Sequence, residues 1–169
     1  MDIFLIVSII FVPVPLFHLW LHALLGFWRR KPVLFYILCL FFWLFAFWFF
    51  IKIDAVFPLF LFYPSALLFL SGFALVILGL ALMALSILAL GIKRFFVWAV
   101  LVPLSVKQKR ISSGLFKTIP HPAYIGEILI IFGVFLASGK AYLAAAFIFI
   151  IALFPISIYF EEKELNQRV

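Results

Sequence analysis

Long apolar runs alternate with short polar stretches along the 169-residue chain. Each run has roughly the 20 residues that an α-helix needs to cross a bilayer. Lipid offers exposed backbone no hydrogen-bond partner, and the two-residue alternation of a membrane barrel is missing. The pattern therefore predicts an all-α integral membrane protein with about five transmembrane helices. We place them at about Ile3 to Phe27, Val33 to Ile51, Ser65 to Gly91, Ala123 to Ala137 and Tyr142 to Phe160.

Prolines and small residues shape these predicted helices. Pro13 and Pro15 should bend the first helix and Pro155 the last, because a proline removes a backbone donor. The segment from Asp54 to Pro64 should be a turn or a re-entrant piece. Small side chains let helices approach closely in lipid, so the third helix should lie at the centre of the bundle. Its small residues are Gly72, Ala74, Gly79, Ala81 and Ala84.

The chain is expected to form a single membrane domain over residues 1–169. Three N-terminal spans occupy residues 1–92 and an interfacial loop occupies 93–122, within which Phe95 to Leu104 should lie along the membrane surface. A helical hairpin follows at 123–160, turning tightly at Ser138-Gly139-Lys140, and a short tail covers 161–169.

Composition and charge agree with a multi-pass membrane protein, because 69% of the residues are hydrophobic and 11% are charged. Of the 13 lysines and arginines, all except Lys52 and Lys140 fall on one side of a five-span chain. The positive-inside rule then places the N-terminus outside and the C-terminus in the cytoplasm. Topology and lipid headgroups account for the net charge of +7, so no nucleic-acid partner is expected.

The stretch KTIPHPAYIGEIL, residues 117–129, places costly polar groups in an apolar chain. Pro122 suits the first turn of a helix, which puts His121 at its N-cap. Tyr124 and Glu127 follow at steps of three, so they share one face with His121. The amides at such a helix start can hold a carboxylate or a phosphate.

The hairpin should return Glu161 and Glu162 to the same membrane face as His121. Adjacent carboxylates there favour a cationic or hydroxyl-rich ligand, or pairing with nearby lysines and arginines. The alternative is that His121 and Tyr124 only anchor the interface and that the glutamates form a solvated helix end. An acidic group inside a span, such as Glu127, usually faces protein or water.

His18 and His22 stand at i and i+4 on the first helix, a spacing that can hold a metal. No carboxylate or thiol lies nearby in the sequence, so we expect no metal site, and lining a cavity is the more plausible role for one of the two. The single cysteine, Cys39, excludes an internal disulfide. A glycine-rich phosphate loop is absent from the sequence.

The stretch GLFKTIPHPAYIGEILIIFG, followed by a span that ends in Glu-Glu, resembles the isoprenylcysteine carboxyl methyltransferase and phospholipid methyltransferase superfamily. The resemblance covers roughly Gly114 to Glu164. The matching residues are Gly114, Phe116, Lys117, His121, Pro122, Tyr124, Gly126, Glu161 and Glu162.

This resemblance implies that S-adenosylmethionine binds at the cytoplasmic end of the hairpin. The methyl acceptor would be a membrane lipid or a lipidated substrate, either a prenylcysteine carboxylate or a phospholipid amine, entering sideways from the bilayer. No metal is implied, and no single catalytic residue. The implied cofactor-binding residues are His121, Pro122, Tyr124, Glu161 and Glu162, with Lys117 and Glu127 as further pocket residues.

Two departures from the family pattern predict weakened or lost cofactor binding. Pro120 stands where the family has an arginine, and the sequence ends at Val169, where family chains continue with a closing tail. The same His-Pro-x-Tyr-x-Gly-Glu run also resembles membrane sterol and steroid reductases, which use NADPH. A third alternative is a non-catalytic membrane protein that keeps the fold. The short chain with few spans favours the methyltransferase.

Overall fold

The computed structural model describes residues 2–56, 59–103, 111 and 113–166. These residues form helices joined by short connections, with no strand apart from an isolated bridge between Phe60 and Lys140. The helices in the described part of the chain are α1 (Ile3–Phe11), α2 (Val14–Ala23), α3 (Leu25–Arg30), α4 (Pro32–Val56), α5 (Ala66–Leu90), α6 (Ile92–Phe95), α7 (Trp98–Leu101), α8 (Leu115–Thr118), α9 (Pro122–Ser138) and α10 (Ala141–Asn166).

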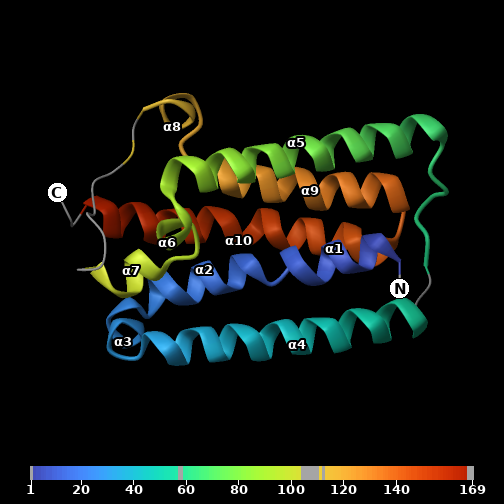
Figure 1. The fold of residues 1–169 in the computed structure, drawn as a ribbon. Helices are drawn as coiled ribbons and strands as arrows, with labels where there is room; N and C mark the ends of the chain where they lie inside the picture. The colour runs from blue at the N-terminus through green and yellow to red at the C-terminus, as the bar shows by residue number, and fades with distance from the viewer. Residues whose placement is uncertain (1, 57–58, 104–110, 112, 167–169) are drawn as a thin grey trace.

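The long helices lie side by side in one bundle (Figure 1). Within the described residues, four stretches are long and apolar enough to cross a membrane: Ile3–Ala23, Pro32–Val56, Ala66–Leu90 and Ala141–Asn166. The remaining apolar helix, α9, has 17 residues. It therefore extends about 26 Å, close to the ~30 Å of a hydrocarbon core. The predicted all-α membrane protein is confirmed.

The two early prolines interrupt the hydrogen-bonded helix of the first span, which still runs from Ile3 to Ala23. α1 ends at Phe11 and α2 begins at Val14, with Pro13 as the N-cap of α2. The hydroxyl of Ser157 on α10 donates a hydrogen bond to the carbonyl oxygen of Pro15 at 3.4 Å. In contrast, α10 continues through Pro155.

Two expectations about the middle of the chain need correction. The non-helical segment predicted from Asp54 to Pro64 begins later, because α4 continues to Val56, while residues 59–64 form no helix. The helix expected at the centre of the bundle, α5, lies at its edge, where Gly72, Gly79 and Ser86 are its buried residues. It packs through one face against α9, and a Cβ added at Gly126 of α9 would come within 2.7 Å of the Gly79 carbonyl oxygen. The small residues therefore serve one close helix pair.

The predicted tight hairpin between α9 and α10 is confirmed. Gly139 ends α9 with a φ of 68°, in the left-handed region that glycine adopts without steric cost. The segment after α4 covers this turn: the Leu61 amide donates to the Gly139 carbonyl oxygen at 2.8 Å, and the Ala141 amide donates to that of Leu59 at 2.9 Å. Of the predicted interfacial segment, α6 and α7 form two short helices, while Leu104 lies outside the described residues.

Two polar clusters occupy opposite ends of the bundle. At the end that holds the N-terminus and the hairpin turn, Lys140 Nζ lies 2.9 Å from Asp2 Oδ2 and 2.6 Å from Asp54 Oδ1. Burial would lower the pKa of Lys140, but the hydrogen bonds to Asp54 and Asp2 outweigh it, so its pKa lies above the ordinary value. The other end gathers α3, α6, α7, α8 and the C-terminal part of α10 (Figure 1).

Candidate functional site

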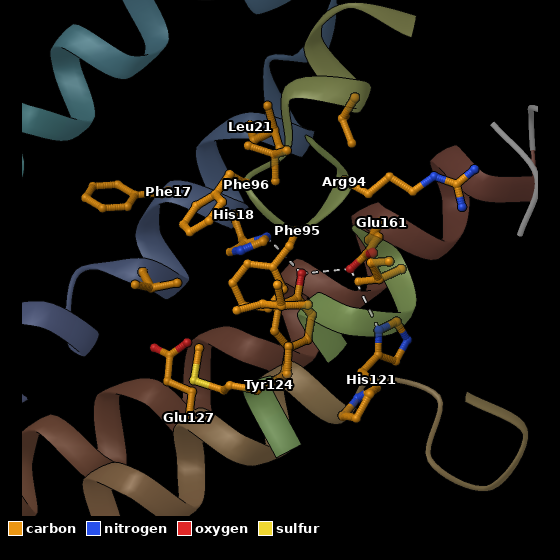
Figure 2. A pocket seen from close by; sticks show the side chains of 18 of the residues that line it. Phe17, His18, Leu21, Arg94, Phe95, Phe96, His121, Tyr124, Glu127 and Glu161 are labelled. Atoms are coloured by element: carbon orange, nitrogen blue, oxygen red, sulfur yellow. Dashed lines mark hydrogen bonds and ion pairs between the residues drawn. The ribbon is translucent and has the colours of Figure 1, made fainter. Parts of the chain in front are cut away.

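A cavity of about 590 Å³ lies at the second of these ends. Its wall is mostly apolar and comes from the N-terminal helices, from α4 to α6 and from the C-terminal hairpin. Polar side chains gather in one part of the wall, where several of them point toward one another (Figure 2). These residues are His18, His22, Arg94, His121, Tyr124, Glu127, Glu161 and Glu162.

Tyr124 connects three helices in this polar part. Its hydroxyl donates a hydrogen bond to Glu161 Oε2 at 2.7 Å. The same oxygen lies 2.9 Å from His18 Nδ1. Because the hydroxyl proton goes to Glu161, the hydroxyl oxygen accepts from an Nδ1–H of His18, and His18 Nε2 is left as an acceptor. The ring of Tyr124 also stacks on Phe154, with centroids 4.7 Å apart.

His121 lies at the start of α9, where the sequence predicts it. Its ring is nearly parallel to that of Tyr124, with an interplanar angle of 5° and centroids 5.6 Å apart. His121 Nε2 lies 3.1 Å from Glu162 Oε1, and Nδ1 lies 3.8 Å from Glu161 Oε2. The His121 side chain makes no capping hydrogen bond, so it does not occupy the amides of the first turn of α9.

A second polar contact holds the end of α10 against the N-terminal helices. Glu164 Oε2 lies 2.9 Å from His22 Nδ1, and Glu164 Oε1 accepts a hydrogen bond from Arg29 Nη2 at 2.7 Å. Arg29 Nε also donates to the Val100 carbonyl oxygen of α7 at 3.1 Å. These contacts fix α10 beside α2, α3 and α7, and so they fix the position of Glu161 one helical turn earlier.

The connection between α6 and α7 covers part of the cavity. Phe95 and Phe96 line it, and the Tyr36 hydroxyl of α4 donates to the Phe96 carbonyl oxygen at 2.7 Å. Arg94 precedes them and also lines the cavity. The segment thus adds two aromatic rings and one cation to a wall that the hairpin alone would leave incomplete.

Glu127 lies deeper along α9 than Tyr124 and differs from the other polar residues of the wall. Its side chain is 1% exposed. Among the described residues, none makes a hydrogen bond to its Oε1. It points away from the Tyr124, Glu161 and His121 group (Figure 2).

The structure brings together six of the seven site residues that the sequence predicts: His121, Pro122, Tyr124, Glu127, Glu161 and Glu162 line one cavity. Lys117 does not join them, because it lies exposed on the short helix α8. Both histidines of the first span, His18 and His22, line the cavity, whereas the sequence predicted this role for one of the two. No group of three metal-binding side chains occurs in the described part of the chain.

The sequence did not predict Arg94 as a wall residue of the cavity. It also did not predict the contact of Arg29 with Glu164 that holds the end of α10. Glu164 carried a signal, since it stands one turn after Glu161 in the same acidic run. Arg94 and Arg29 carried none, because each is one of several adjacent basic residues in a connection between helices.

Comparison with known proteins identifies the family. A family model described as phospholipid methyltransferase matches residues 67–168, which is more than half of the chain and includes α9 and α10 with His121, Tyr124, Glu161 and Glu162. No curated protein and no solved structure matches the chain significantly. The matched segment holds all the polar wall residues of the cavity except His18 and His22, and the chain belongs to the phospholipid methyltransferase family.

Proposed function

We propose that this protein transfers a methyl group from S-adenosylmethionine to a lipophilic acceptor at the cytoplasmic face of the membrane. The observation that carries the proposal is a polar group in the wall of one cavity, in which Tyr124 hydrogen bonds to Glu161 and His18, and His121 pairs with Glu162. This group closes the polar part of a mostly apolar space, in a chain of a methyltransferase family. A reaction between a polar donor and a lipid acceptor needs both kinds of surface.

The residues present fit the methyl donor. S-adenosylmethionine carries an ammonium, a carboxylate, two ribose hydroxyls and a cationic sulfur. Glu161 and Glu162 can accept hydrogen bonds from the ammonium or the hydroxyls. The uncapped first turn of α9 can bind the carboxylate. The cavity of about 590 Å³ lies within the range of about 300–1,000 Å³ typical of small-molecule sites.

The methyl donor supplies an electrophilic methyl group on a positively charged sulfur. Tyr124 and His18 hold Glu161 in one orientation, so the protein does not have to order that carboxylate when the donor binds. Phe95 and Phe96 add two apolar rings to the cavity wall, and an apolar wall holds less water around the reactants. Holding the two reactants in line within a closed space accounts for most of the acceleration that such a transfer requires.

The apolar part of the cavity accommodates the acceptor. Its wall includes Ile10 and Val14 from the first span, Trp43 from α4, and Leu80 and Met83 from α5. These helices lie in the part of the bundle that spans the bilayer, so a lipid tail would remain in apolar surroundings throughout. Both acceptor classes implied by the sequence, a prenylcysteine carboxylate and a phospholipid amine, carry such a tail.

The distribution of basic residues supports the proposed orientation. In the structure, α3, α6 and α8 bring Arg29, Lys93 and Lys117 to the cavity end, while Lys52 and Lys140 belong to the helix ends at the other side. We expect a cysteine at position 140 of a Cys39→Ala protein to react with an impermeant maleimide added outside cells, and one at position 117 not to react. The reverse labelling would refute the orientation.

Calorimetric titration of the purified protein with S-adenosylhomocysteine and with NADPH tests the function. We expect S-adenosylhomocysteine to bind and NADPH not to bind. His121→Ala and Glu161→Ala should each weaken S-adenosylhomocysteine binding by roughly tenfold or more, since a hydrogen bond to a charged group contributes about 1.5–3 kcal/mol. Binding of NADPH alone would favour the reductase alternative, and unchanged affinity in both folded variants would contradict the site.

A further inference from the structure

We infer that His18 is the general base of the proposed transfer, and that its Nε2 takes the proton which the nucleophilic atom of the acceptor carries. The inference rests on the proposed function and adds a catalytic residue from outside the family match, which covers residues 67–168. Three observations carry it: the tautomer that Tyr124 imposes on His18, the position of Nε2 in the cavity, and the neighbouring side chains.

Two hydrogen bonds in series fix the proton of His18. Glu161 Oε2 accepts from the Tyr124 hydroxyl at 2.7 Å, so the hydroxyl oxygen accepts from His18, whose Nδ1 lies 2.9 Å away. The proton of the neutral imidazole is therefore on Nδ1, and Nε2 carries a lone pair. A carboxylate that orients a histidine through one ring nitrogen and leaves the other nitrogen unprotonated is the arrangement of a general base. Here a tyrosine hydroxyl stands between the two.

The lone pair of His18 faces the cavity. The side chain is half-buried and lines that space. Within the described part of the chain, Nδ1 makes a hydrogen bond and Nε2 makes none. The ring meets that of Tyr124 edge to face, with centroids 5.0 Å apart, so its orientation is fixed by packing as well as by the hydrogen bond. Nε2 is thus available to a ligand in the cavity.

The other candidate bases in the cavity wall are less suited to this role. His121 and His22 each contact a carboxylate of α10, at 3.1 and 2.9 Å. Glu127 is 1% exposed, and its Oε1 has no hydrogen-bond partner among the described residues. A carboxyl group so buried without a cation stays neutral, and a neutral carboxyl group has already taken up its proton. His18 therefore remains as the base.

His18 also lies where the acceptor is expected. His18 and Glu161 lie on opposite sides of the Tyr124 hydroxyl (Figure 2). If Glu161 holds the methyl donor, His18 faces the remaining part of the cavity. Val14, which belongs to the apolar wall proposed for the acceptor, stands four residues before His18 on α2 and so shares its face. An acceptor whose tail lies along Val14 brings its polar head to His18.

The proposed step is balanced for an acceptor nitrogen. The ammonium, R–NH₃⁺, gives one proton to His18 Nε2 and becomes R–NH₂. The imidazolium that forms keeps its Nδ1–H bond to Tyr124, which is itself bonded to the Glu161 carboxylate. The nitrogen lone pair forms the N–C bond to the methyl group as the C–S bond breaks, and the electron pair of that bond stays on sulfur. The products are R–NH₂⁺–CH₃, S-adenosylhomocysteine and protonated His18, which returns its proton to water.

Nitrogen-15 NMR of the full chain with labelled histidine, in detergent and without any ligand, tests the tautomer. The sequence has three histidines, so His22→Asn and His121→Asn identify two signals and leave that of His18. We expect Nδ1 to be protonated and Nε2 unprotonated. Tyr124→Phe should convert His18 to the Nε2-protonated tautomer that a free imidazole favours. A protonated Nε2 in the unmodified protein, or a tautomer that Tyr124→Phe leaves unchanged, would overturn the inference.

His18→Asn separates the base from a structural role. The asparagine amide places an N–H near the position of Nδ1, so it can still donate to Tyr124, but it has no basic nitrogen. The variant should keep its melting temperature and bind S-adenosylhomocysteine as the unmodified protein does. Transfer of a labelled methyl group to phosphatidylethanolamine should become roughly 100-fold slower or more, which is the usual size of a general-base effect. An unchanged rate in the folded variant refutes the role, and if the variant does not fold, the NMR result decides.

A second acceptor provides the matched control. The carboxylate of N-acetyl-S-farnesylcysteine has no proton to lose, so any transfer to it should be equally fast in His18→Asn and in the unmodified protein. Equal losses with both acceptors would show that His18 has only a structural role. Transfer to the carboxylate alone, or to neither acceptor, also overturns the inference. If the unmodified protein does not bind S-adenosylhomocysteine, the proposed function itself fails, whereas the tautomer of His18 is measured without that ligand.

Discussion

Tyr124→Phe removes one hydroxyl group from the centre of the candidate site and leaves the ring in place. The hydroxyl donates to Glu161 at 2.7 Å and lies 2.9 Å from His18 Nδ1. The ring would keep its stacking on His121 and Phe154, so the local packing should survive. The variant therefore measures how much the fixed orientation of Glu161 contributes to cofactor binding.

The magnitude follows from the contacts that remain. Without the hydroxyl, the nearest polar neighbour of Glu161 in this group is His121, whose Nδ1 is 3.8 Å away and too far for a hydrogen bond. A hydrogen bond to a charged group contributes about 1.5–3 kcal/mol. If half or more of this energy serves to fix Glu161 for the ligand, S-adenosylhomocysteine should bind roughly 3- to 100-fold more weakly.

Calorimetric titration with S-adenosylhomocysteine measures this loss, and Tyr142→Phe provides the matched control. Tyr142 also donates its hydroxyl to a carboxylate, that of Asp54 at 3.0 Å, but at the opposite end of the bundle. Both variants should lower the melting temperature, while only Tyr124→Phe should weaken binding. Equal affinity in Tyr124→Phe and the unmodified protein, or equal losses in both variants, would refute the reasoning.

Three further substitutions test the packing and the two polar ends. Gly126→Ala should destabilise the protein by about 1–3 kcal/mol, because the added Cβ would overlap the Gly79 carbonyl oxygen. Gly26→Ala, which places a Cβ in open space, should not, and thermal unfolding in detergent measures both. Pro120→Arg, which places a guanidinium in the cavity wall, should strengthen S-adenosylhomocysteine binding by roughly tenfold in a calorimetric titration, and weaker binding would contradict this. Lys140→Met should lower the melting temperature, because it leaves the carboxylates of Asp2 and Asp54 without their cation. Because the pKa of Lys140 is raised, the stability that Lys140 contributes should persist below about pH 10 and disappear only as the pH rises through the raised pKa.

Local periodicity and turn chemistry made much of this fold predictable from the sequence. The length of each apolar run set the bounds of α5, α9 and α10 to within a few residues, apart from the C-terminal end of α10, which continues past Phe160 to Asn166. The short turn at Gly139 required α10 to return beside α9, and the spacing from His121 to Tyr124 required a shared face. The contacts of Glu161 and Glu162 with these residues follow from those two local facts.

Only the tertiary structure decided which other helices complete the site. In lipid every face of a helix can be apolar, so the sequence pattern does not reveal which face points inward or which helices are neighbours. The small residues of α5 thus predicted a central position. In the structure its buried glycines contact α9 alone, and most of the helix is exposed. Likewise, no local sequence pattern predicts that His18 contacts Tyr124 or that Arg94 lines the cavity, because these contacts join segments far apart in the chain. The hairpin could be predicted from the sequence because one short turn fixes its geometry. The rest of the cavity wall depends on how separate helices pack against each other.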